Sequence, residues 1–337
     1  MLHVQFYDGS PTTHWRVLMR LITFAAEGRR VGALLNGDDT VLDLALAAPD
    51  RPEFASMSTL IESGGEGLDR ARELASAAPE HALMPATAVH WCPPLPRPAR
   101  MRDCGLFTQH LADALQQIAR RQAEGAGDDP EAAFQELMAS GRFTLDPLFT
   151  ERVLYYNADP LLITGPNDTI APPEGAKELD YELEFAVVVG RDGRDIPLDR
   201  ARDHIFGYTI YNDWSARDLQ LRLMQTGVGP CEGKDFATSL GPCLVTADEI
   251  ADPYALTMSA RINGEQWSSG STSTMTHSFE EAIAQFSRTG GVFAGEVIAS
   301  GTVASGTGFD AGKHLSSGDL VELEVEGIGI LRNRVAL

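Results

Sequence analysis

The sequence is poor in cysteine for its length. The 337 residues include four cysteines with no CxxC spacing among them, namely Cys92, Cys104, Cys231 and Cys243. Four thiols are too few to staple a chain of this size, and their spacing does not match a zinc ribbon. We therefore expect reduced thiols and exclude a disulfide-built scaffold.

Positive charge and long apolar runs are also scarce. Lys and Arg number 27 against 48 Asp and Glu, which gives a formal net charge of −21. A field of this sign disfavours nucleic acid and anionic membranes as partners. No apolar run approaches the roughly 18–20 residues of a membrane span, and no signal-peptide pattern opens the chain. We expect a cytoplasmic enzyme or binding protein, in which a local basic group holds any anionic substrate.

What is present suffices for one large domain and a small one. The segment from residue 19 to 44 predicts three short strands, and short helices follow over 53–78. Four prolines then fall within residues 93–98, which excludes helix or central strand and predicts a stiff linker. The predicted divisions are an extension over 1–18, a small N-terminal α+β domain with its linker over 19–98, and a catalytic domain over 99–337.

The second part of the chain begins with helices and continues with strands. Leu111, Leu115 and Ile118 share one face of a predicted helix. Asp129 and Pro130 are typical of the cap and first position of a second helix. From residue 153 onward, short apolar runs alternate with Gly, Pro and Asp turns. This predicts a mixed β core with inserted helices.

Two glutamates stand at the start of the apolar run "YELEFAVVVG". Glu182 and Glu184 point to one face of the predicted strand, and that face continues with Ala186 and Val188. A buried, unpaired carboxylate costs several kcal/mol, and two neighbours also repel each other. A divalent cation removes both costs, and hard oxygen ligands select Mg²⁺, Ca²⁺ or Mn²⁺. The alternative is a strand end whose first residues are solvated.

The same spacing occurs near the end of the chain with a different context. In "LVELEVEG", Glu322, Glu324 and Glu326 alternate with apolar residues along the whole segment. Complete alternation predicts a strand with one solvated face, whose glutamates need no function.

A third carboxylate follows another predicted strand, in "YTIYNDWSARDLQ". Ser215 and Asp218 match a capping box. If the helix begins near residue 213, Asp213, Arg217 and Gln220 lie on one stripe. This arrangement would place a third carboxylate on the metal and aim the other two side chains at the same site. The alternative is a solvated helix face with an Asp–Arg pair.

Several segments together resemble the fumarylacetoacetate hydrolase family over roughly residues 100–337. They are "LDYELEFAVVVG", "GYTIYNDWSARDLQ", "GKDFATSLGPCLVT", "ASGT" and "GDLVELEVEGIGILRNRV". The segment 19–90 resembles the small leading domain of many bacterial members. The resemblance implies a β-sandwich roll, a homodimer, a small oxo-acid substrate and a divalent metal, usually Mg²⁺, with Mn²⁺ or Ca²⁺ as alternatives.

The resemblance also implies roles for individual residues. The implied metal ligands are Asp103, Glu182, Glu184 and Asp213. The implied catalytic residues are His110 and Lys234. The residues implied to line the pocket, or to hold the substrate and the groups around it, are Tyr156, Arg217, Gln220, Thr238 and Thr302.

The partner of the histidine is less directly implied. In the family's hydrolases a distant glutamate orients it, and no residue after "SGTVASGTGFDAGKH" aligns with that glutamate. Shorter members use a glutamate three residues after the histidine, and here that position is Asp113. A spacing of three suits a helical pair. We also expect residues 104–140 to form a lid that carries His110 over the metal.

These roles predict a metal-dependent C–C hydrolase acting on an acylpyruvate-like or fumarylacetoacetate-like acid through an enolate. His110 would act as the general base for water. The same enolate chemistry serves isomerisation, tautomerisation and decarboxylation, so the fold and metal do not fix the reaction. An inactive family member that retains the metal is the alternative of another class.

Overall fold

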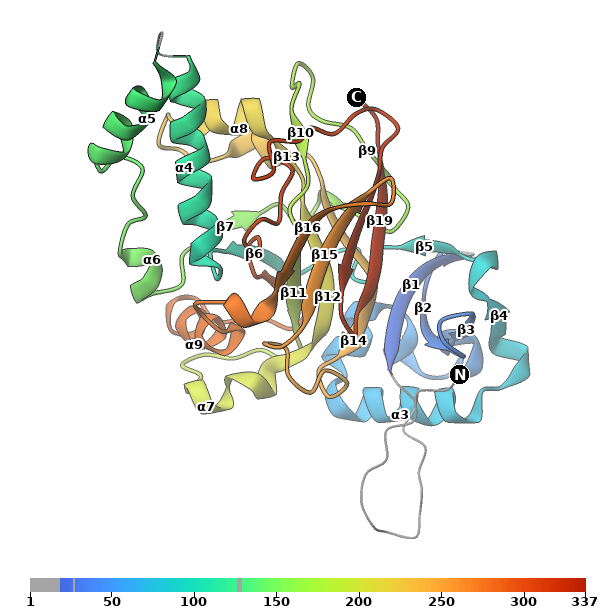
Figure 1. The fold of residues 1–337 in the computed structure, drawn as a ribbon. Helices are drawn as coiled ribbons and strands as arrows, with labels where there is room; N and C mark the ends of the chain where they lie inside the picture. Colours follow the sequence, from blue (N-terminus) through green and yellow to red (C-terminus); the bar gives the residue numbers. More distant parts are fainter. Residues whose placement is uncertain (1–18, 27, 126–128) are drawn as a thin grey trace.

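The structure is a computed structural model that describes residues 19–26, 28–125 and 129–337. The predicted extension over 1–18 lies outside these residues. A 12-stranded sheet and a five-stranded sheet form the body, and a two-stranded pair lies at one end (Figure 1). The predicted mixed β core with inserted helices is confirmed.

The large sheet runs through the whole body in the order β4-β3-β2-β1-β14-β12-β11-β17-β6-β7, and β5 and β8 pair with β1 and β14. Its strands are β1 Arg20–Ala26, β2 Gly28–Leu35, β3 Thr40–Asp43, β4 Leu83–Pro85, β5 His90–Cys92, β6 Arg100–Cys104, β7 Tyr155–Ala158, β8 Ile163–Thr164, β11 Glu184–Val189, β12 Ile205–Asp213, β14 Thr238–Thr246 and β17 Glu296–Ala299.

The N-terminal strands join this sheet rather than forming a separate one. β1 pairs with β14 in antiparallel register, Arg20 opposite Val245 and Leu21 opposite Leu244. The three predicted strands are confirmed as β1 to β3. Residues 93–98 contain no helix or strand, as the four prolines predict. The division near residue 98 remains a prediction, since the sheet continues across it.

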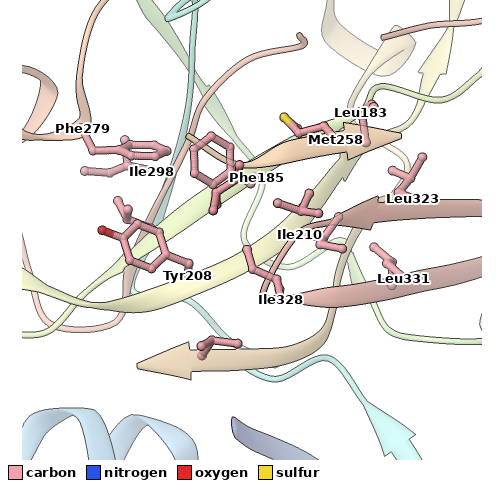
Figure 2. Packing of buried hydrophobic residues seen from close by; sticks show 14 of the residues in the cluster. Leu183, Phe185, Tyr208, Ile210, Met258, Phe279, Ile298, Leu323, Ile328 and Leu331 are labelled. Atoms are coloured by element: carbon pink, nitrogen blue, oxygen red, sulfur yellow. The ribbon is translucent and has the colours of Figure 1, made fainter. Parts of the chain in front are cut away.

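The five-stranded sheet, in the order β16-β15-β18-β19-β9, packs against the large sheet. Its strands are β9 Thr169–Ile170, β15 Thr257–Ile262, β16 Glu265–Ser271, β18 Leu320–Val325 and β19 Gly329–Val335. Figure 2 shows the core between the sheets, where Phe185 and Ile210 approach Met258 and Leu323. The short pair is β10 Leu179–Asp180 with β13 Ser215–Ala216.

Nine α-helices occur within the described residues. They are α1 Leu44–Ala47, α2 Met57–Glu62, α3 Gly64–Ala77, α4 Thr108–Glu124, α5 Pro130–Ala139, α6 Leu148–Glu151, α7 Leu198–Ala201, α8 Arg217–Met224 and α9 Phe279–Thr289. Among these residues, no helix is both long and apolar enough to cross a membrane.

Helices α4 and α5 form a hairpin with a small core of its own. Ala119 and Ala123 of α4 pack with Phe134 of α5 and with Phe143. The predicted cap is confirmed, because the Asp129 side chain accepts from the Ala132 amide at 3.0 Å. The hairpin lies on the side of the sheets opposite the N-terminal strands (Figure 1).

The capping box predicted at Ser215 is wrong. Ser215 lies in β13, opposite Asp180 of β10, so its backbone is extended. Its hydroxyl donates to the Asp213 carbonyl at 3.1 Å, and the Asp218 carboxylate accepts instead from the Lys177 amide. Helix α8 begins at Arg217, and Asp213 is the last residue of β12.

Candidate metal centre and its histidine

Neighbouring strands bring the predicted carboxylates to one end of the large sheet. The order β12-β11-β17-β6 places the end of β12, the start of β11 and the end of β6 side by side. Ala299 lies opposite both Ala186 and Asp103, and Glu184 lies opposite Tyr211, so Asp103, Glu184 and Asp213 share one face. The sheet register therefore explains why residues far apart in sequence meet.

Three of the carboxylates could hold a metal ion together. One oxygen from each of Asp103, Glu182 and Glu184 lies within 4.8 Å of the others. All three side chains are buried. Glu184 Oε2 has no hydrogen-bond partner among the described residues, and such a buried acceptor costs free energy unless something else satisfies it. A hard divalent cation fits this oxygen-only donor set.

The electrostatics of two of these carboxylates, Asp103 and Glu184, agree with that fit. Burial raises the pKa of Asp103 well above its ordinary value, and the charge of Asp213 raises it further. Burial also raises the pKa of Glu184 well above its ordinary value, with Asp103 adding to the effect. Asp103 and Glu184 are thus destabilised as carboxylates by desolvation and by their acidic neighbours, which is the cost that a cation would offset.

Asp213 is held by protein groups beside the cluster. Its Oδ2 accepts from the Tyr156 hydroxyl and from the Lys234 ammonium. Tyr156 also donates to Asp103 at 3.1 Å, and Lys234 Nζ lies 2.8 Å from Glu182 Oε2. The role of Asp213 as a metal ligand, like the roles of Asp103, Glu182 and Glu184, remains a prediction.

Arg217 contacts carboxylates on two sides. Its Nη1 donates to Glu182 Oε1 at 2.7 Å and to Gln220 Oε1 at 3.1 Å. Its Nε donates to Asp180 Oδ2 at 2.9 Å. Burial works to raise the pKa of Glu182, but the cations Lys234 and Arg217, with a smaller effect of His110, lower it. The guanidinium is therefore already engaged by Glu182 and Asp180, and a substrate carboxylate would have to compete for it.

The two predicted threonines also lie at the site. Thr302 donates from its hydroxyl to Glu184 Oε1 at 3.1 Å. Thr238 begins β14 opposite Asp213 and lines a small pocket with Tyr156 and Lys234. Both threonines are buried. The structure thus brings the predicted substrate-binding residues together with the carboxylates.

The histidine partner differs from the prediction. His110, near the start of α4, lies with Nδ1 3.2 Å from Asp310 Oδ2, and both side chains are buried. Asp113 is half-buried on α4 and accepts from Gln109 at 2.8 Å. In this structure Asp310 rather than Asp113 therefore lies beside the His110 ring, and an orienting role for Asp113 stays a prediction.

Sequence reasoning missed two carboxylates, Asp180 and Asp310. Asp180 stands two residues before Glu182, so the alternation that singles out Glu182 and Glu184 extends back to it. For Asp310 the sequence offers no comparable signal, since it lies in a loop and meets His110 across 200 positions.

The chain is similar in sequence to known proteins, over residues that include most of the candidate site. Residues 134–336 match the model of the fumarylacetoacetate (FAA) hydrolase C-terminal family. The human mitochondrial oxaloacetate tautomerase FAHD2A is 30% identical over 94% of this chain and 91% of its own length. The oxaloacetate tautomerase YisK of Bacillus subtilis is 40% identical, over 55% of this chain and 62% of its own length.

A solved structure is similar along nearly the whole chain. The fumarylacetoacetate hydrolase of Exiguobacterium antarcticum superimposes with a TM-score of 0.68 at 27% identity, covering 94% of this chain and 99% of its own. The similarity thus includes the N-terminal strands as well as the sheets that carry the carboxylates.

Proposed function

Because this chain belongs to the fumarylacetoacetate hydrolase family, we propose that it interconverts the keto and enol forms of a small 2-oxo dicarboxylic acid such as oxaloacetate. The observation that carries this choice is the similarity to the human oxaloacetate tautomerase over 94% of the chain. The reaction moves one proton between carbon and oxygen, which requires a base beside a group that stabilises negative charge.

The metal would be held by Asp103, Glu182 and Glu184, with Asp213 as the proposed fourth ligand. Mg²⁺ is the proposed ion, with Mn²⁺ or Ca²⁺ as alternatives, because all the donors are oxygens. When bound, a divalent cation acts as a Lewis acid and a template for the substrate oxygens. It would also reduce the negative charge that a dianionic substrate meets at this site.

His110 is the proposed base. Asp310 accepts from Nδ1 and thereby holds the other ring nitrogen free to take a proton from the substrate carbon and return one to it. Lys234 donates to Glu182 and Asp213 in this structure and would stabilise charge on a substrate oxygen. We propose that Thr238 and Thr302, rather than Arg217, contact the substrate carboxylates.

The hairpin of α4 and α5 is the proposed lid. It carries His110 and is joined to the body through the His110–Asp310 pair and through Arg121, whose Nη1 donates to Glu178 at 2.7 Å. Hydrogen exchange with and without a dicarboxylate inhibitor would test this role. Slower exchange of residues 104–140 on binding is expected, and equal protection in both states would count against a lid.

Hydrolysis of a C–C bond is the second candidate. It is supported by the similarity to a fumarylacetoacetate hydrolase structure over nearly both chains. In that reaction His110 would take its proton from water rather than from carbon.

The deciding experiment offers the purified protein enol oxaloacetate with Mg²⁺ and follows the loss of the enol absorbance. We expect a faster decay than with Mg²⁺ alone, and loss of that acceleration with EDTA or in His110→Ala. Pyruvate formation would reveal decarboxylation. Cleavage of an acylpyruvate in ¹⁸O water, with label in the released acid, would instead support hydrolysis. A decay equal to the protein-free rate would refute tautomerisation.

A further inference from the structure

Asp180 is a buried carboxylate that no proposed step uses. It ends β10, and its Oδ2 lies 2.8 Å from Nη2 and 2.9 Å from Nε of Arg217. The same guanidinium donates through Nη1 to the metal-site residue Glu182 at 2.7 Å. Asp180 is therefore one residue removed from the metal centre, through a rigid planar group.

The other contacts of Asp180 reach a loop. The backbone amide of Gly308 donates to Asp180 Oδ1 at 2.9 Å, and that of Phe309 donates to Oδ2 at 3.2 Å. Position 308 requires glycine, because an added Cβ would lie 2.7 Å from Asp180 Oδ1 and 2.9 Å from the Lys313 carbonyl. The close approach of this loop to Asp180 thus depends on the absence of a side chain.

The next residue of the loop is Asp310, which lies 3.2 Å from His110. Glu182, Arg217, Asp180, the amides of 308–309 and Asp310 therefore form one continuous set of contacts that ends at His110. We propose that Asp180 is a positioning residue that fixes the base relative to the metal ligand. This inference rests on the proposed role of His110 in proton transfer.

The chemistry of a carboxylate explains why aspartate suits this position. Both of its oxygens accept, so Asp180 can serve Arg217 and two loop amides together. An asparagine offers one acceptor and one donor, and in either orientation its NH₂ group would face an N–H donor. Asp180→Asn should therefore break either the contact with Arg217 or a contact with the loop amides, and it leaves the charges of Glu182 and Asp310 in place.

The test compares Asp180→Asn with Glu296→Gln in the full-length protein loaded with Mg²⁺. Glu296 is a matched control, since it is fully buried and bound to two arginines, at 2.8 Å from Arg100 and 2.9 Å from Arg102. The direct readout is the NMR signal of the His110 ring in histidine-labelled protein. Asp180→Asn should shift that signal, and Glu296→Gln should leave it unchanged.

Kinetics and metal affinity separate positioning from a general loss of structure. In Asp180→Asn, kcat should fall about 10–100-fold, the range for residues that orient functional groups, with a smaller change in KM. Asp310→Asn should lower kcat similarly and leave the Kd for Mn²⁺ unchanged. Gly308→Ala provides a second approach, because its methyl group would displace the loop without altering any charge.

The inference is overturned if the His110 signal is unchanged in either Asp180→Asn or Gly308→Ala. If Asp180→Asn does not fold, Gly308→Ala decides alone. The ring signal also separates this inference from the proposed function. A shifted signal in a protein that does not act on oxaloacetate would refute the tautomerase role and support the positioning role of Asp180.

Discussion

Two strand segments carry glutamates at alternate positions, and they differ in almost everything else. Glu182 precedes β11 and Glu184 begins it, and all six residues of β11 are buried. Glu322 and Glu324 lie in β18, where buried and half-buried residues alternate, and Glu324 is 43% exposed. The comparison teaches that the spacing of acidic residues sets only their face. What covers that face decides whether they are buried together, where a cation would stabilise them, or are solvated.

The largest expected effect comes from removing a glutamate of the buried segment. Glu184→Ala should abolish metal binding and lower kcat/KM by about 10³-fold, since a bound metal contributes several kcal/mol to catalysis. Calorimetric titration with Mn²⁺ and the enol assay would measure the two losses. The matched change in the other segment, Glu322→Ala, should preserve both. Metal binding by Glu184→Ala would remove the distinction between the strands.

The next largest expected effect comes from removing His110, which tests whether the buried carboxylates alone suffice for activity. His110→Ala should lower kcat about 10²–10⁴-fold, the range for a lost general base, with Mn²⁺ affinity nearly unchanged. Asp113→Asn should behave like the parent protein, because Asp113 contacts Gln109 rather than His110. Full activity of His110→Ala would contradict the proposed base. Reduced activity of Asp113→Asn would support the pairing of Asp113 with His110 that the sequence predicted.

Removal of the metal should lower the stability of the protein only when the site that contains Glu182 and Glu184 is intact. A ligand at a hundredfold excess over its Kd stabilises the folded state by about 2.7 kcal/mol. Mg²⁺ should therefore raise the Tm of the parent protein and of Glu322→Ala, and EDTA should reverse the change. Glu184→Ala should show no Mg²⁺-dependent shift. A shift of equal size in all three proteins would place the ion elsewhere.

The smallest expected effect comes from a substitution in β18, the strand with one solvated face. Glu324 pairs with Arg261 at 2.8 Å, but both side chains are partly exposed. Surface pairs of this kind contribute about 0.2–1 kcal/mol, so Glu324→Gln should change the free energy of unfolding by less than about 1 kcal/mol. Urea denaturation measures it, and a larger loss would show that this face is not simply solvated.

The sequence predicted what depends on local pattern. The buried β11, the alternating β18, the strands β1 to β3 and the capped helix α5 all follow from periodicity and turn residues. The candidate site residues were proposed because they stand inside segments that resemble those of the family. The proximity of Asp103 to Glu184 was predicted from the family resemblance and not from periodicity. The sequence of neither strand reveals the order of the strands in the sheet.

What the sequence did not predict depends on long-range contacts. The start of α8 was misplaced because Ser215 and Asp218 also satisfy a local capping pattern, and only the pairing of β13 with β10 excludes it. Asp113 was proposed as the partner of His110, and Asp310 was not considered, for the same reason. A partner three residues away can be inferred from helix geometry, whereas one 200 positions away requires the fold.

The pairing of β1 with β14 bears on how the chain could be divided. Without residues 19–98, part of β14 would become an open edge with unpaired amides and carbonyls, a template for association between chains. A shortened protein that begins at residue 99 should therefore aggregate although it retains every proposed metal ligand. Residues 19–98 would thus contribute solubility to the enzyme. Their removal should lower the yield of soluble protein before it alters the catalytic site.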